Sequence, residues 1–113
     1  MYHITRLPNG LRLATAELPH MASVSLGIWS AVGSRCERVG ETGISHFLEH
    51  MLFKGTSTRP TAPQISEAIE GAGGTLNAYT TRELTCYWNN MPYERAGTGI
   101  EILADMVQHS VLE

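Results

Sequence analysis

The 113-residue chain has only two cysteines and no apolar run long enough to cross a membrane. Cys36 and Cys86 form neither a C-x-x-C pair nor a disulfide framework. They are therefore expected to be free thiols in a reducing compartment, or else one incidental pair. The chain opens directly with a strand pattern and shows no charged leader followed by an apolar segment. These absences predict a cytoplasmic protein without a membrane partner, with the periplasm and the mitochondrial matrix left open.

The chain also lacks an excess of basic residues. Its net charge is −3 and its pI is about 5.9, so it creates no positive field for phosphate groups. Nucleic acid is therefore excluded as an expected partner. The length allows one domain or less, and no internal repeat, low-complexity tract or linker stands out.

Two imidazoles and one carboxylate lie close together in the segment His46-Phe47-Leu48-Glu49-His50. In a helix, residues four apart lie one above the other, so His46 and His50 can chelate one ion. Glu49 lies beside this pair and can accept a proton from the water that the ion activates. The H-x-x-E-H order therefore predicts a zinc peptidase site with Glu49 as the general base. The alternative is a pair of solvated histidines, or histidines satisfied by backbone carbonyls.

The apolar residues around this motif follow helical spacing. They are Ile44, Phe47, Leu48, Met51 and Leu52. On a helical wheel this stripe is opposite the direction shared by the two histidines and Glu49. We therefore expect the stripe to be buried against a core while the ionisable side chains face outward.

Strand patterns are expected at residues 2–7, 11–16, 23–28, 76–81 and 84–90. The first two flank Asn9-Gly10, a hairpin signal because both residues tolerate positive φ. Thr42 is the expected N-cap of the motif helix, and Thr61 with Gln64 has capping-box spacing at the start of a second helix. A third helix is indicated by Ala96, Ile100, Leu103 and Val107. This order predicts an α+β fold with helices on one face of a sheet.

Further motifs lie on both sides of H-x-x-E-H. They are Leu7-Pro8-Asn9-Gly10-Leu11, Val32-Gly33-Ser34-Arg35, Glu37-Arg38, Gly73-Gly74-Thr75-Leu76-Asn77-Ala78-Tyr79-Thr80, Glu83-Leu84-Thr85 and Ile102-Leu103-Ala104-Asp105-Met106. Together with residues 46–56, and in this order and spacing, they resemble the insulinase and pitrilysin family of zinc metallopeptidases. The resemblance is greatest to bacterial members of the mitochondrial processing-peptidase branch.

This resemblance implies a partial α/β-roll with a mainly antiparallel sheet and helices packed on one face. It also implies that residues 1–113 are the N-terminal part of a single peptidase domain. The third zinc ligand of such peptidases is a glutamate on a later helix, and both that position and a related second half-domain are absent from this sequence. The sequence is then either part of a full-length peptidase or a genuinely short chain. The 113-residue chain alone is accordingly expected to lack peptidase activity.

The resemblance also implies roles outside the motif. Asn77 and Ala78 match an edge strand on which an extended substrate is laid by backbone pairing, and ordinary sheet pairing is the alternative. Glu83 either contacts the zinc ligands without binding the ion itself, or is a solvated turn residue. Glu101 and Asp105 are expected to face solvent, and neither they nor the terminal Glu113 is proposed as a zinc ligand.

Two functions are consistent with these observations. The first is a zinc-dependent endopeptidase that hydrolyses unstructured peptides or presequences, with Zn²⁺ held by His46 and His50. The second is a non-catalytic peptide-binding or partner subunit, because the third ligand is missing from this chain. Subunits of that kind usually lose the motif, which this chain keeps. A peptide is the expected partner, and a homodimer or heterodimer with a related subunit is left open.

Overall fold

The computed structural model describes residues 2–110. The strands are β1 (Tyr2–Arg6), β2 (Arg12–Ala16), β3 (Ser23–Ser30), β4 (Thr75–Thr80) and β5 (Thr85–Pro92). The helices are α1 (Ile44–Leu52), α2 (Ala62–Glu70) and α3 (Ala96–His109), with short 3-10 helices at Ser34–Cys36 and Tyr93–Arg95. Every expected strand and helix is present, and the strand boundaries differ from the expected ones by at most two residues. None of the helices in this part of the chain has the length and apolar character needed to cross a membrane.

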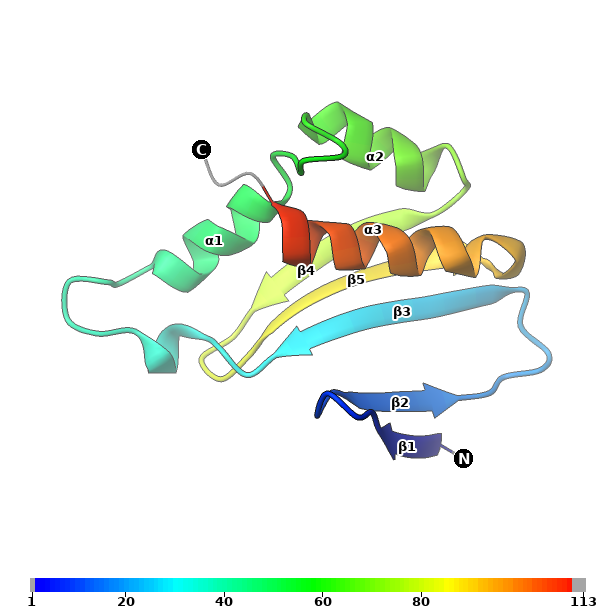
Figure 1. Ribbon diagram of the computed structural model, residues 1–113, viewed down its shortest axis with the longest axis horizontal. Coiled ribbons are helices and arrows are strands. Elements are labelled where there is room, and N and C mark those ends of the chain that lie inside the picture. The colour runs from blue at the N-terminus through cyan, green and yellow to red at the C-terminus, as the bar shows by residue number, and fades with distance from the viewer. Residues whose placement is uncertain (1, 111–113) are drawn as a thin grey trace.

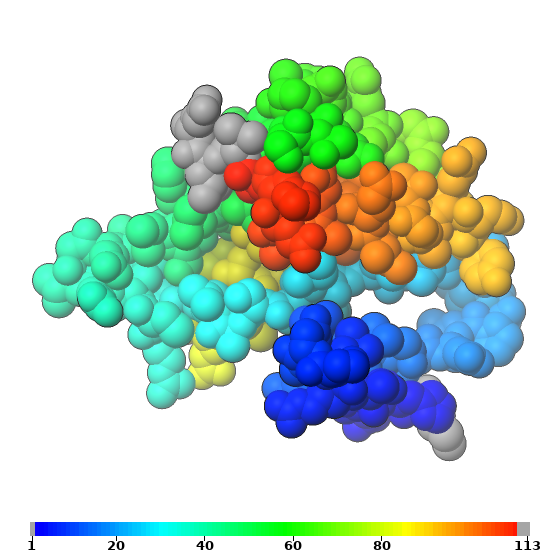
Figure 2. All heavy atoms as spheres, viewed as in Figure 1, coloured from blue at the N-terminus to red at the C-terminus, as the bar shows by residue number. Residues whose placement is uncertain are grey.

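The strands form two separate antiparallel sheets. β1 and β2 make a hairpin around the expected Asn9-Gly10 turn, in which Gly10 has φ of 90°. The other sheet has the order β3-β5-β4, so that β4 lies at one edge and β3 at the other. The hairpin lies beside β3 as a lobe of its own in this view (Figures 1 and 2). Within residues 2–110, the outer edge of β4 has no strand paired to it.

The core lies between the three-stranded sheet and the helices α2 and α3, which run across one of its faces (Figure 1). Its buried members come from α2, β5 and α3: Ile65, Ile69, Tyr87, Met91, Ile102, Leu103 and Met106. Alternate residues of β3 and β4 pack against them, as expected when one sheet face is covered. The predicted α+β architecture with helices on one face is confirmed.

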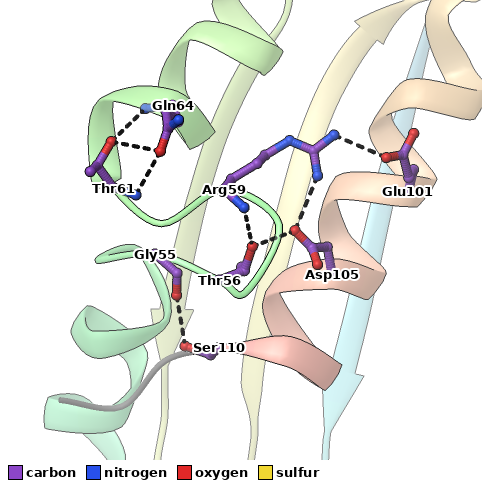
Figure 3. Close-up of polar contacts among 8 residues, drawn as sticks. All are labelled: Gly55, Thr56, Arg59, Thr61, Gln64, Glu101, Asp105 and Ser110. Atoms are coloured by element: carbon purple, nitrogen blue, oxygen red, sulfur yellow. Dashed lines mark hydrogen bonds and ion pairs between the residues drawn. The ribbon is translucent and has the colours of Figure 1, made fainter.

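Helix α2 begins as its sequence predicts. The Thr61 side chain accepts a hydrogen bond from the Gln64 backbone N–H, and the Gln64 side chain accepts one from the Thr61 backbone N–H (Figure 3). This reciprocal pair satisfies two of the amide groups that a helix start leaves without partners. The predicted capping box is therefore confirmed.

The buried stripe of α3 differs from the expected one. Ile100 and Val107 are exposed, whereas Gly99, Ile102 and Met106 are buried along with Leu103. A Cβ on Gly99 would lie 2.7 Å from Leu26 Cδ1 and 2.7 Å from Met91 Cγ, so the missing side chain lets this face approach the sheet. The close contact at Gly99 sets the rotation of α3 about its axis. A hydrophobicity pattern does not predict such a contact.

Asp105 is buried, which contradicts the expectation that it faces solvent. Its Oδ2 accepts hydrogen bonds from the Thr56 hydroxyl at 2.6 Å and from Arg59 Nη1 at 3.0 Å (Figure 3). Arg59 Nη2 also donates to the exposed Glu101 at 2.9 Å. These contacts fasten the loop between α1 and α2 onto α3. The Arg59–Glu101 pair agrees with the exposed position expected for Glu101.

The two cysteines are free thiols, one of the two states expected for them. Cys36 is exposed in the 3-10 helix, and Cys86 is buried in β5. Burial raises the pKa of the Cys86 thiol, which therefore stays protonated at neutral pH.

Candidate metal centre

The two histidines of α1 lie one turn apart, with their rings tilted by 51° and their Nε2 atoms close together. His50 Nε2 is 3.0 Å from His46 Nε2, and the ring centroids are 4.6 Å apart. Two nitrogens at a tetrahedral angle, each about 2.0–2.1 Å from zinc, would lie roughly 3.3 Å apart, so this spacing suits a shared ion. A carboxylate oxygen of Glu49 completes a group whose three ligand atoms all lie within 4.8 Å of one another. The donor set and its spacing therefore fit zinc.

The orientation of α1 differs from the expected one. Ser45 and Glu49, four residues apart, are its buried positions, and Glu49 is only 8 % exposed. Ile44, Phe47 and Leu48 are exposed, so the expectation that the apolar stripe is buried is wrong for these residues. Only the stripe's C-terminal end, at Met51 and Leu52, is half-buried. The flank that carries Ser45 and Glu49 is the one turned inward, and α1 makes its sheet contacts with β4. The imidazoles are thus exposed while the carboxylate is sheltered.

Glu49 has a defined partner in the sheet. The hydroxyl of Thr80, the last residue of β4, donates a hydrogen bond to Glu49 Oε2 at 2.6 Å. Hydroxyl-to-carboxylate bonds of 2.5–2.7 Å belong to the stronger class of protein hydrogen bonds. Thr80 was not singled out from the sequence as a site residue. The only signal there was its place at the end of the Asn77-to-Thr80 motif.

The start of α1 is held by Glu37 and not by the expected Thr42. The N-cap position is Gly43, with φ of 89°, and it has no side chain to offer. The Glu37 carboxylate instead accepts hydrogen bonds from the backbone N–H groups of Gly43 and Ser45, each at 2.9 Å. A carboxylate at this end also suits the positive end of the helix dipole. These backbone bonds, that from Ser45 foremost, lower the pKa of Glu37.

We expect the stability of the chain to depend on pH through Glu37. Because its pKa is lower in the folded state, its contribution is complete above the ordinary glutamate pKa of 4.5. The contribution is lost as the pH falls through the folded value. Glu37→Gln should therefore reduce the loss of stability between about pH 5 and pH 3. Denaturant midpoints across this range measure the effect, with Glu67→Gln on α2 as the control. Equal pH dependence in both variants would contradict the assigned role.

The segment before Glu37 also braces the turn between β4 and β5. Ser34 and Arg35 donate backbone hydrogen bonds to the carbonyls of Thr81 and Arg82, at 3.3 and 2.8 Å. A Cβ on Gly33 would lie 2.2 Å from the Thr81 carbonyl oxygen, so only glycine allows this approach. One segment, residues 33–37, thus holds both the start of α1 and the end of β4.

Glu83 lies in this turn, where its carboxylate pairs with Arg35 at 3.0 Å. The two side chains are 71 % and 74 % exposed, so the pair is screened by water and contributes little to stability. Among residues 2–110, Glu83 makes polar contacts with Arg35 and Thr81 and none with the histidines or Glu49. The role of Glu83 in supporting the metal site remains a prediction.

An open hollow of about 540 Å³ lies beside His46. It is bounded by the segment 33–37, the start of α1 and the end of β4; its lining residues are Ser34, Glu37, Thr42, Gly43, Ser45, His46, Thr80, Thr81 and Arg82. The candidate metal centre is therefore reachable from solvent.

Asn77 and Ala78 lie in β4, paired with Trp88 and Tyr87 of β5. The Asn77 side chain is exposed, and its Oδ1 accepts a hydrogen bond from the Ala78 backbone N–H at 2.8 Å. Ala78 packs against the core. Because β4 is an edge strand within the described residues, the backbone on its outer side is open to a further strand. Their substrate-binding role remains a prediction. Glu113 lies outside the described residues.

A chelating pair of imidazoles with a sheltered carboxylate beside it, next to an open sheet edge, has the features of a metallopeptidase centre. The family model described as Insulinase (Peptidase family M16) matches residues 12–113. The chain is 46 % identical over 109 residues to an uncharacterized zinc protease of Rickettsia bellii, covering 96 % of this chain and 26 % of the relative. It is 44 % identical over 110 residues to the mitochondrial-processing peptidase subunit beta of Blastocladiella emersonii, covering 97 % of this chain and 23 % of the relative.

A solved structure is also similar to this chain. The crystal structure of a protease from Helicobacter pylori matches with a TM-score of 0.93 and 26 % identity, over 100 % of this chain and 27 % of the other. The chain belongs to the insulinase family, peptidase family M16, a family of zinc metallopeptidases. The family that the sequence motifs predict is confirmed. The chain spans about a quarter of the length of the curated relatives it matches.

Proposed function

We propose that this chain carries the metal-binding and proton-transferring residues of a zinc-dependent endopeptidase. The observation that carries the proposal is the 3.0 Å separation of His46 Nε2 and His50 Nε2, with Glu49 in the same group of potential ligands. His46 and His50 would hold the zinc ion. When bound, zinc acts as a Lewis acid that lowers the pKa of water and stabilises negative charge on the scissile carbonyl oxygen.

The residues of the chain would divide the remaining work. Glu49 takes a proton from the attacking water as the water oxygen bonds to the scissile carbonyl carbon. The carbon–nitrogen bond then breaks, and Glu49 returns the proton to the leaving nitrogen. The substrate is an unstructured peptide or presequence laid along β4 next to Asn77 and Ala78, where backbone pairing would hold it extended. We place the enzyme in the cytoplasm, as a homodimer or with a related subunit.

The proposal is tested by metal removal. The protein, expressed from its complete open reading frame, is incubated with unstructured peptides that carry a fluorophore and a quencher. A chelator should reduce cleavage about 100-fold or more, and zinc should restore it. Cleavage that continues unchanged after the metal is removed would contradict the proposal. Peptide binding without cleavage in the zinc-loaded protein would favour the peptide-binding subunit instead.

A further inference from the structure

We propose that Thr80 is a positioning residue for Glu49. The Thr80 hydroxyl fixes the orientation of the Glu49 carboxylate, which is the base in the proposed function. This inference deepens the proposed function and rests on it. It assigns a role to a side chain outside H-x-x-E-H, on the same edge strand as Asn77 and Ala78.

The contact leaves the two carboxylate oxygens of Glu49 in different positions. Oε2 accepts the hydrogen bond from the Thr80 hydroxyl at 2.6 Å. Within residues 2–110, the only buried side-chain oxygen or nitrogen without a hydrogen-bond partner is Asn89 Oδ1. Oε1 of Glu49 accepts no hydrogen bond from these residues and is not among the buried atoms, so it keeps contact with solvent. One oxygen is anchored to the sheet, and the other is free to take a proton from water.

The burial of Glu49 makes its hydrogen bond from Thr80 more important. Glu49 is 8 % exposed, and its charge, after burial, is the second cause of the raised pKa of the neighbouring Tyr87 phenol. In such surroundings an inward-facing carboxylate oxygen that loses its donor carries a desolvation cost that an exposed oxygen does not. Without the Thr80 hydroxyl, the carboxylate is expected to turn outward, towards solvent or the histidine pair.

Thr80 is itself held in place. It pairs with Thr85 of β5, whose hydroxyl donates to the Val32 carbonyl at 2.7 Å. In the turn that follows, the Thr81 hydroxyl accepts hydrogen bonds from the backbone N–H groups of Glu83 and Leu84, at 3.2 and 3.1 Å. The hydroxyl that orients the base thus belongs to a braced strand end. The strand on which a peptide would be laid also sets the position of the base.

The kinetic test compares Thr80→Val, Thr80→Ser and Thr15→Val in zinc-loaded protein expressed from the complete open reading frame. Valine keeps the shape of threonine but lacks the hydroxyl, so kcat should fall about 10- to 100-fold while KM stays within about twofold. Serine keeps the hydroxyl and should retain kcat within about threefold. Thr15 is exposed in β2, which belongs to the separate hairpin, so Thr15→Val should match wild type. Equal losses in Thr80→Val and Thr80→Ser, or a kcat within twofold of wild type in Thr80→Val, would overturn the proposal.

A second readout does not depend on catalysis. Metal-free protein is treated with a water-soluble carbodiimide, and labelling of Glu49 is measured by mass spectrometry against Glu67, an exposed carboxylate of α2. Release of Glu49 in Thr80→Val should increase its labelling about threefold or more, while Thr80→Ser labels like wild type. Unchanged labelling in Thr80→Val would overturn the contact. If the proposed function alone is wrong, Glu49→Gln retains activity while the labelling difference persists.

Discussion

Replacing Glu49 by glutamine should abolish peptide hydrolysis and leave the zinc content unchanged. The amide has the shape of the carboxylate but cannot take a proton from water, so the loss falls on the chemical step. We expect kcat to fall about 10²- to 10⁴-fold, the range typical of a general base. Glutamine can still accept the hydrogen bond of Thr80 through its amide oxygen, so the site should keep its form. Steady-state kinetics and zinc analysis of the same preparation measure both effects.

The same measurement on Glu83→Gln decides between the two roles left open for Glu83. Glu83 is a carboxylate in the turn that follows β4, and its ion pair with Arg35 is exposed. We expect Glu83→Gln to keep kcat within about threefold, since exposed pairs contribute little. A larger fall would favour the role of Glu83 in supporting the metal site. Activity that survives in Glu49→Gln would show that the base has been wrongly assigned.

Replacing Asp105 by alanine should cause the largest loss of stability among single polar substitutions in this chain. It leaves the Thr56 hydroxyl, in a residue that is 0 % exposed, without its acceptor and removes the inner partner of Arg59. Removing one partner of a buried charged contact lowers the free energy of unfolding by about 2–4 kcal/mol, because the remaining groups stay desolvated. Chemical denaturation followed by circular dichroism measures the change in the free energy of unfolding.

Glu101→Gln separates the effect of burial from the effect of charge in the cluster formed by Thr56, Arg59, Glu101 and Asp105. Glu101 binds the same Arg59 guanidinium at 2.9 Å, but its side chain is 64 % exposed. The cost of losing this carboxylate should be about 0–1 kcal/mol, the usual range for surface pairs. If the Asp105 and Glu101 variants lose equal stability, the cluster is stabilised by the charge of Arg59 alone. The buried acceptor would then have no special role.

The sequence predicted the features of this chain that depend on local spacing. The four-residue interval between His46 and His50 places both rings on one side of a helix whatever else the helix contacts. The capping box at Thr61 and the Asn9-Gly10 turn are likewise local, and each forms as expected. The antiparallel sheet with helices on one face followed from the order of the elements and from the resemblance to the family.

The errors concern the rotation and capping of helices, which distant residues decide. The buried side of α1 carries Glu49 because β4 presents the Thr80 hydroxyl there, 31 residues further along the chain. Glu37 caps α1 in place of Thr42 because the turn after the 3-10 helix brings its carboxylate to two free backbone N–H groups. The rotation of α3 depends on the close contact at Gly99, and the burial of Asp105 depends on Thr56 and Arg59. A helical wheel contains none of these partners.

The central claim is that His46 and His50 bind one zinc ion together. A crystal structure of the zinc-loaded protein, with data collected across the zinc absorption edge, tests it most directly. We expect one anomalous peak about 2.0–2.1 Å from both His46 Nε2 and His50 Nε2, with the Glu49 carboxylate beside the ion and still hydrogen-bonded to Thr80. Zinc bound elsewhere, or bound to only one of the two imidazoles, would contradict it.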